Sequence, residues 1–206
     1  MRITIIISIL SFWTMELQAD SWDLPKATRY FSEDSSYMIK VVPRHTPEKD
    51  YRWKYAAAKR KKKFSPQDTT IISCHAILYN VKGEEDTVEI WNKKLLNLFA
   101  PVTVLVSNNG DRVITLDDWS SLGYGYNVFA IYNELGELVK RYQLDDFSIF
   151  PLNNYEFSIS SIWWRSGQKL LNDRRQLKLY MRTENGQNGS VLYDLDAYQF
   201  KKNSQD

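Results

Sequence analysis

The chain has 206 residues, and its 27 basic and 25 acidic side chains leave a formal net charge of only +2. Its single cysteine, Cys74, excludes an internal disulfide, and with two histidines there are too few ligands for a structural zinc site of the usual kind. A chain of this length is nevertheless large enough to form a stable hydrophobic core without disulfides or a structural metal ion.

The first residues resemble a secretory leader. Arg2 is followed by an apolar run, Ile3 to Trp13, and then by a short polar stretch that ends in Ala19. This mainly apolar run of eleven residues is short for a membrane span, which needs about twenty. We therefore predict a signal peptide over residues 1–19 and a secreted or periplasmic product. An uncleaved anchor is the alternative. No later stretch approaches the length of a membrane span, and export excludes intracellular nucleic acid as a partner.

Strand signals dominate the rest of the chain, because short runs rich in β-branched and aromatic residues alternate with turn residues. The expected strands are Ser36–Val42, Ile71–Val81, Thr87–Trp91, Thr103–Ser107, Arg112–Leu116, Asn127–Tyr132, Leu177–Arg182 and Ser190–Leu195. Three dipeptides, Asn109-Gly110, Asn185-Gly186 and Asn188-Gly189, are typical of tight hairpin turns. The sequence therefore predicts a single all-β domain of antiparallel meanders over residues 20–206.

One segment departs from this pattern and is strongly basic. Seven basic residues and no acidic one lie between Arg52 and Lys63. The segment forms either a short helix near residues 50–64 or an exposed basic insertion over about 50–65. Its densest part is a candidate anion-binding strip made of Lys59, Arg60, Lys61, Lys62 and Lys63. After export, such a strip would meet lipid headgroups, acidic polysaccharide or extracellular nucleic acid. The alternative is a solvated loop.

A weak internal repeat organises the strands. The segment Ser32–Val41 aligns with Ser107–Leu116, and each is a polar turn that leads into an alternating strand. Three units can be traced, which span Ala27–Asn97, Val102–Phe147 and Ile159–Phe200. Units of this kind resemble propeller blades, in which four short antiparallel strands recur about every forty to fifty residues. That resemblance implies an open or incomplete β-propeller, because closed propellers need about four to eight blades.

The central stretch, Pro101 to Asp146, also resembles segments of uncharacterised exported bacterial proteins. The shared features are Pro-Val at a strand start, a Ser-x-x-Gly turn, Asp-x-Trp and Gly-Tyr-Gly. In this chain they are Pro101-Val102, Ser107–Gly110, Asp117–Trp119 and Gly123–Gly125. The resemblance covers less than a third of the chain, and no activity comes with it.

The loop after this central strand contains the residue types that a binding site uses. Its candidate ligand-binding residues are Asp117, Asp118, Trp119, Tyr124 and Tyr126. Aromatic faces beside carboxylates suit sugar rings or cationic groups. The spaced acidic pattern of a calcium loop is missing, so we predict no metal there. The alternative is that these residues serve only packing and turn formation.

We predict no catalytic residue and no cofactor. Cys74 and His75 are neighbours on an expected strand, where adjacent side chains point to opposite faces, so they cannot act together on one substrate. No phosphate-binding loop, nucleophile elbow or zinc-protease motif occurs. The preferred function is therefore a non-enzymatic binding or structural module, with glycan or an anionic surface polymer as the expected partner. Two alternatives remain open: a carboxylate-dependent hydrolase acting on surface glycan, and a surface protein held to anionic polymer or lipid by the basic strip.

Overall fold

The structure is a computed structural model that describes residues 22–44, 72–83 and 86–201. Within these residues the regular structure consists of β-strands and three short 3₁₀ turns. The predicted all-β antiparallel fold is confirmed. The predicted leader over 1–19, the helix at 50–64 and the basic strip Lys59–Lys63 lie outside the described residues.

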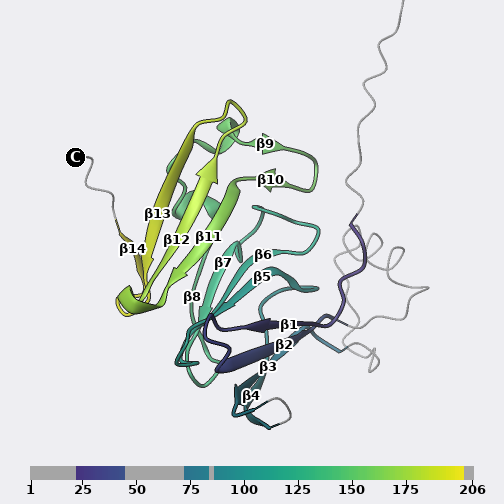
Figure 1. Cartoon of the computed structure of the whole chain (residues 1–206). Coiled ribbons are helices and arrows are strands. Elements are labelled where there is room, and N and C mark those ends of the chain that lie inside the picture. The colour runs from purple at the N-terminus through teal and green to yellow at the C-terminus, as the bar shows by residue number, and fades with distance from the viewer. Residues whose placement is uncertain (1–21, 45–71, 84–85, 202–206) are drawn as a thin grey trace, which may run out of the picture.

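The strands form three four-stranded sheets, each a meander whose strand order follows the chain (Figure 1). The first sheet contains β1 (Thr28–Phe31), β2 (Tyr37–Val42), β3 (His75–Val81) and β4 (Thr87–Lys94). The second contains β5 (Pro101–Val106), β6 (Val113–Asp118), β7 (Phe129–Tyr132) and β8 (Leu138–Tyr142). The third contains β11 (Arg165–Leu171), β12 (Gln176–Arg182), β13 (Asn188–Asp194) and β14 (Gln199–Lys201).

A two-stranded ribbon lies between the second and third sheets in the sequence. It is made of β9 (Glu156–Phe157) and β10 (Ile162–Trp163). The three 3₁₀ turns are η1 (Leu144–Asp146), η2 (Leu152–Asn154) and η3 (Asn172–Arg174). Each unit traced in the sequence covers one of the three sheets, apart from Pro101 at the start of β5 and Lys201 at the end of β14, so the repeat has a structural counterpart.

The first hairpin turn of each sheet explains why the repeat is visible in the sequence. In the first two sheets, Ser32 and Ser107 open the turn, and each serine hydroxyl accepts the backbone N–H five residues later at 3.0 Å. The fourth residue of the turn has a left-handed backbone, with φ of 61° at Ser35 and 70° at Gly110. In the third sheet, Arg175 occupies the same position with φ of 52°. These turns therefore share one geometry.

One predicted turn is wrong. Asn188-Gly189 does not form a turn, because both residues belong to β13 and pair with Arg182 and Met181 of β12. The preceding segment already closes the hairpin, since the Thr183 N–H donates to the Gln187 carbonyl at 2.9 Å. Gly189 instead lies under the end of the Ile149 side chain, which would have to move to make room for a Cβ there.

The core consists of two layers, one on each face of the second sheet. Val113, Ala130 and Tyr132 face the first sheet, where they join a cluster of buried residues that includes Ile39 and Leu78. The opposite face of the second sheet packs on the third sheet through a cluster that contains Ile114, Leu116, Phe129, Ile131, Leu177, Leu179, Met181 and Tyr193. The second sheet is thus covered on both faces, whereas the first and third sheets each have one face outside this core.

Cys74 and His75 have the opposite orientations expected from the sequence. Cys74 is 1% exposed, in the layer between the first and second sheets, and His75 is half-buried. Burial raises the pKa of the Cys74 thiol to about 12, and the Asp118 carboxylate adds to this shift. The thiol therefore stays protonated near neutral pH, the form that is a poor nucleophile.

The packing predicts a large difference between two phenylalanines. Phe129 is fully buried at the centre of an aromatic cluster, whereas the side chain of Phe157 is 65% exposed. Phe129→Ala should lower the free energy of unfolding by about 3–5 kcal/mol, and Phe157→Ala by less than about 1 kcal/mol. Urea denaturation of both variants measures this. Equal effects of the two changes would contradict the assignment of the core.

Candidate functional site

The five candidate ligand-binding residues lie at one end of the second sheet, where β6 leads into the loop before β7. The ribbon β9–β10 lies against the same loop, because the Ile162 N–H donates to the Leu122 carbonyl at 2.8 Å. Figure 1 shows the ribbon and this loop projecting on the same side of the molecule. Gly123 permits this close approach, since a Cβ there would come within 2.9 Å of Ile162.

Asp117 is a buried anchor at the centre of this end. Its side chain is 0% exposed, and its left-handed backbone (φ 60°) interrupts the alternation of β6. One carboxylate oxygen accepts the Trp164 indole N–H at 2.8 Å and the Gly123 backbone N–H at 2.9 Å. The other oxygen accepts the Arg165 guanidinium at 3.1 Å. Asp117 thus joins the second sheet, the loop and the start of the third sheet.

Burial is the largest influence on the Asp117 carboxyl group and raises its pKa. The Arg165 charge and the hydrogen bonds from Trp164, Gly123 and Arg165 act in the opposite direction. Because both oxygens are occupied by fixed donors and the side chain is inaccessible to solvent, the group is not placed to exchange a proton with a bound substrate.

Asp118 and Trp119 also hold chain segments in place. Asp118 accepts the Leu98 backbone N–H at 3.1 Å, and burial raises its pKa while that bond and the other hydrogen bonds to the carboxylate oppose the rise. The Trp119 indole N–H donates to the Asp23 carbonyl at 2.9 Å, and its ring packs edge-on against Phe99 at 5.5 Å between centroids. These contacts secure the segments before β1 and β5.

The two tyrosines differ from these three residues because they lie at the surface. Tyr126 is 71% exposed, and the Arg141 guanidinium lies 5.9 Å from the centre of its ring. Tyr124 is 36% exposed, and its hydroxyl donates to the Ser158 carbonyl at 3.1 Å. The structure therefore divides the predicted site into a structural half and an exposed half.

The ribbon supplies exposed residues that sequence reasoning did not include in the site. Ile159 at its tip is 86% exposed, Phe157 is 65% exposed and Trp163 is 39% exposed. The Trp163-Trp164 pair was the available signal, because on a strand one ring of the pair enters the core and the other faces out. Trp164 is fully buried, as that reasoning requires. The exposed residues of the loop and the ribbon are called the apolar end patch below: Tyr124, Tyr126, Phe157, Ile159 and Trp163.

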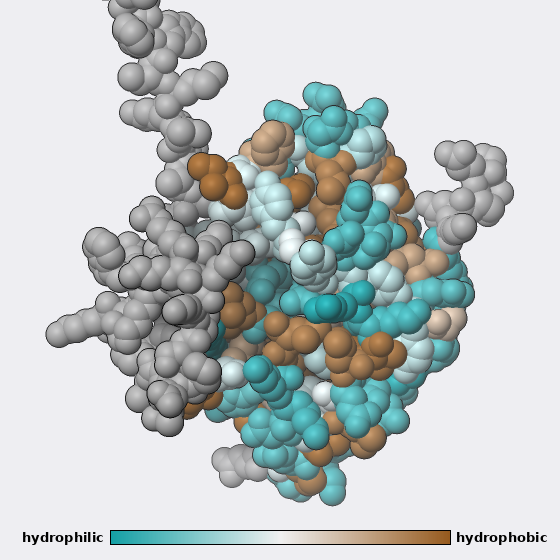
Figure 2. Space-filling view, turned by 180° about the vertical axis from the view of Figure 1, so that it is seen from behind, coloured by the Kyte–Doolittle hydropathy of each residue, from teal (hydrophilic) through white to brown (hydrophobic). Residues whose placement is uncertain are grey.

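Exposed apolar residues also occur elsewhere, so exposure alone does not identify the patch. Figure 2 shows the rear of the molecule with apolar residues in separate groups between hydrophilic ones. The apolar end patch differs because its loop and its ribbon are both fixed to buried groups, Asp117 and Trp164. Its side chains are therefore presented by backbone that is already ordered, which reduces the entropic cost of binding.

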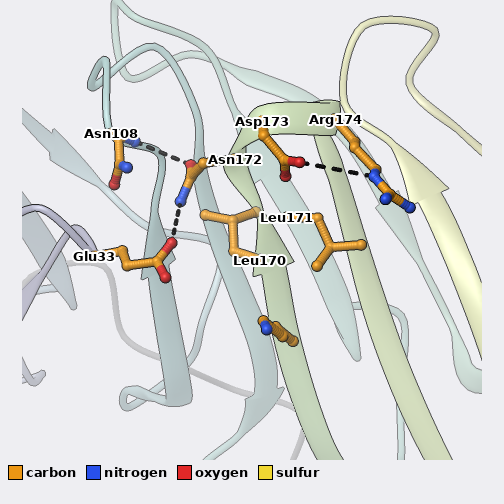
Figure 3. A pocket seen from close by; sticks show the side chains of 8 residues that line it. Glu33, Asn108, Leu170, Leu171, Asn172, Asp173 and Arg174 are labelled. Atoms are coloured by element: carbon orange, nitrogen blue, oxygen red, sulfur yellow. Dashed lines mark hydrogen bonds and ion pairs between the residues drawn. The ribbon is translucent and has the colours of Figure 1, made fainter.

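A hollow lies at the other end of the sheets, where the first hairpin turns of the three sheets meet (Figure 3). It has a volume of about 540 Å³. Asn172 contacts the other two turns: its amide oxygen accepts a hydrogen bond from the Asn108 backbone N–H at 3.1 Å, and its amide nitrogen donates to Glu33 at 3.2 Å. The charged groups at the rim of the hollow include the exposed ion pair of Asp173 and Arg174, in which the carboxylate Oδ2 lies 3.7 Å from the guanidinium Nε. These contacts join the three turns, and they leave no unpaired acid aimed into the hollow.

Neither end contains a metal centre among the described residues, where no three His, Cys, Asp or Glu side chains are grouped for a metal ion. In the same part of the chain, no helix is long and apolar enough to cross a membrane. Comparison with known protein families and with curated proteins finds no match to this chain.

The role of Asp117 as an anchor can be tested by removing its carboxylate. Asp117→Ala leaves the buried Trp164 N–H without its acceptor and the Arg165 charge without its counter-ion, so the free energy of unfolding should fall by about 3–5 kcal/mol. Chemical denaturation measures this, with Asp173→Ala as the control because its carboxylate is 77% exposed. An Asp117→Ala protein as stable as the control would show that the buried network does not hold the fold.

Proposed function

We propose that this protein is an exported, non-enzymatic binding module whose contact surface is the apolar end patch. The observation that supports the proposal is the combination of strong exposure and rigid attachment. Tyr126, Phe157 and Ile159 are each more than 60% exposed, on backbone tied to the core through Asp117 and Ile162. Strongly exposed apolar side chains on ordered backbone are typical of interaction sites.

Glycan is the ligand class that fits this surface best. Flat aromatic faces pack against the C–H groups of sugar rings, and nearby polar groups accept or donate hydrogen bonds to sugar hydroxyls. The patch provides the four aromatic rings of Tyr124, Tyr126, Phe157 and Trp163, and the guanidinium of Arg141 lies over the ring of Tyr126. This composition suits a weakly polar carbohydrate chain.

The glycan-hydrolase alternative has less support. Glycosidases need two carboxyl groups that face each other across the substrate. Of the two acids that could serve in this loop, Asp117 is fully enclosed by donors, and Asp118 accepts hydrogen bonds from the segment before β5. A hydrolase would therefore have to use carboxylates outside the predicted loop.

The fold suits an open, propeller-like arrangement of three blades, which is part of the proposal. Three consecutive four-stranded meanders stack face to face, and their first hairpin turns meet through Asn172, Asn108 and Glu33. In a propeller, successive blades pack in this way around an axis. The apolar end patch lies at the end of the second sheet opposite to these turns, because it follows β6 rather than preceding it.

Binding and turnover can be measured together on one set of neutral polysaccharides. Migration of the native protein through gels that contain each polymer should be retarded by at least one of them. The double variant Tyr126→Ala and Phe157→Ala should lose at least about tenfold in affinity, because exposed aromatic residues dominate such contacts. Phe31→Ala combined with Leu135→Ala is the control, since these side chains are 53% and 57% exposed on other surfaces.

Two results would contradict the proposal. One is release of reducing sugar from a retarding polymer by the wild-type protein, because that would show an enzyme. The other is equal loss of retardation in the patch variant and in the control variant. Absence of retardation by every neutral polymer would remove neutral glycan as the ligand class of the apolar end patch.

The proposed export is tested separately by the size of the released product. Expression of the full chain in a bacterial host should release a protein that lacks the first 19 residues and begins at Asp20. Intact mass of the extracytoplasmic fraction measures this. Replacing two apolar residues, Ile6→Lys and Ile7→Lys, should retain the uncleaved chain inside the cell. A cytoplasmic product of full mass from the native sequence would contradict export.

A further inference from the structure

The outer face of the third sheet contains a linear arrangement of cations around one tyrosine. Along β12 the side chains of Leu177, Leu179 and Met181 are fully buried against the second sheet. The alternating side chains Lys178, Tyr180 and Arg182 therefore point away from the core. Successive members of this set are about 6.6 Å apart, because a strand rises about 3.3 Å per residue.

The neighbouring strand adds a third cation beside this line. Lys169 of β11 is the direct register partner of Lys178. Like charges directly opposite each other on a sheet destabilise it, and the cost falls when an anion lies between them. Lys169, Lys178 and Arg182 have no ion-pair partner among the described residues, whereas Lys201 of β14 at the far edge pairs with Asp194 at 3.2 Å.

Tyr180 gives this surface its second property. The Lys178 ammonium lies 5.1 Å from the centre of the Tyr180 ring, and the ring is 37% exposed. Along β12 the outward side chains are therefore a cation at Lys178, an aromatic ring at Tyr180 and a cation at Arg182. A partly exposed ring with a cationic residue before and after it along the strand matches a sugar unit flanked by anionic substituents, because a ring can pack on sugar C–H groups while the cations pair with the charges.

We propose that the outer face of the third sheet binds an anionic polysaccharide along Lys178, Tyr180 and Arg182, with Lys169 beside them. We call these four residues the cationic track. The site is distinct from the apolar end patch, and it uses other residues than the strip Lys59–Lys63. It does not depend on the proposed function, since either surface can bind without the other.

Two other occupants fit the track less well. A single-stranded nucleic acid stacks its successive bases on several aromatic rings, and the outward residues of β11 to β14 include only Tyr180 as an aromatic. A second copy packed head to tail would place the track against the outer face of the first sheet. That face bears Arg29 and Lys40, which are register partners, so the contact would oppose like charges.

The test uses the full chain and heparin as the anionic polysaccharide, with neutral dextran and a twenty-residue oligo-dT as comparison probes. The triple variant Lys169→Gln, Lys178→Gln and Arg182→Gln should lose at least about tenfold in heparin affinity, and the slope of log affinity against log salt should fall by about three. The matched control, Arg29→Gln, Lys93→Gln and Lys140→Gln, removes the same charge from other surfaces and should keep both values near those of the wild type.

Tyr180→Ala separates ring stacking from charge. It should weaken heparin binding several-fold and leave the salt slope unchanged, because no cation is removed. The proposal is wrong if the track triple and the control triple lose affinity equally, or if only Lys61→Gln, Lys62→Gln and Lys63→Gln abolish heparin binding. It is also wrong if oligo-dT binds more tightly than heparin through the same residues. If the wild-type protein does not bind heparin at low salt, the proposal is wrong, and the cations of the track serve only solubility.

Discussion

Burial of the second sheet on both of its faces is the constraint on which the rest of this structure depends. A strand covered on both faces needs apolar side chains at successive positions rather than at alternate ones. β7 meets this requirement at all four of its residues, Phe129 to Tyr132. Because the second sheet is fixed by two layers of packing, the loops at its ends are held relative to the first and third sheets.

Asp117 extends this constraint from the core to the surface. Burying the Asp117 carboxylate without partners would destabilise the fold, because the charge loses its hydration. The hydrogen bonds and the ion pair from its donors offset this desolvation cost. Those donors come from the loop, from Trp164 and from Arg165, so the loop and the ribbon are ordered together. The predicted acidic residues thus act by positioning the exposed aromatic residues rather than by contacting a ligand.

The sequence predicted the class of fold because strand alternation and turn chemistry are local properties. The repeat was detectable from Ser32 and Ser107, since the same side-chain hydrogen bond builds both turns. β11 was missed because it contains residues of low strand propensity, Gly167 and Lys169, and its pairing with β12 overrides that preference.

The site was predicted only in part, for a geometric reason. Periodicity shows which residues alternate, but not that a left-handed backbone at Asp117 turns its carboxylate toward the third sheet. Ile159 lies between two serines, a residue type that is typical of loops. The local sequence therefore did not indicate that Ile159 extends the surface beside Tyr124. Both facts depend on contacts between residues more than thirty positions apart.

Native-state hydrogen exchange is the most direct test of this account, because it reports the order of the loop and the ribbon in the free protein. The amide of Gly123 donates to Asp117 and that of Ile162 to Leu122, so both should be protected. In Asp117→Ala both should exchange much faster, while core amides such as that of Ile131 stay protected. Fast exchange of Gly123 and Ile162 in the wild-type protein would contradict the claim that Asp117 orders this surface.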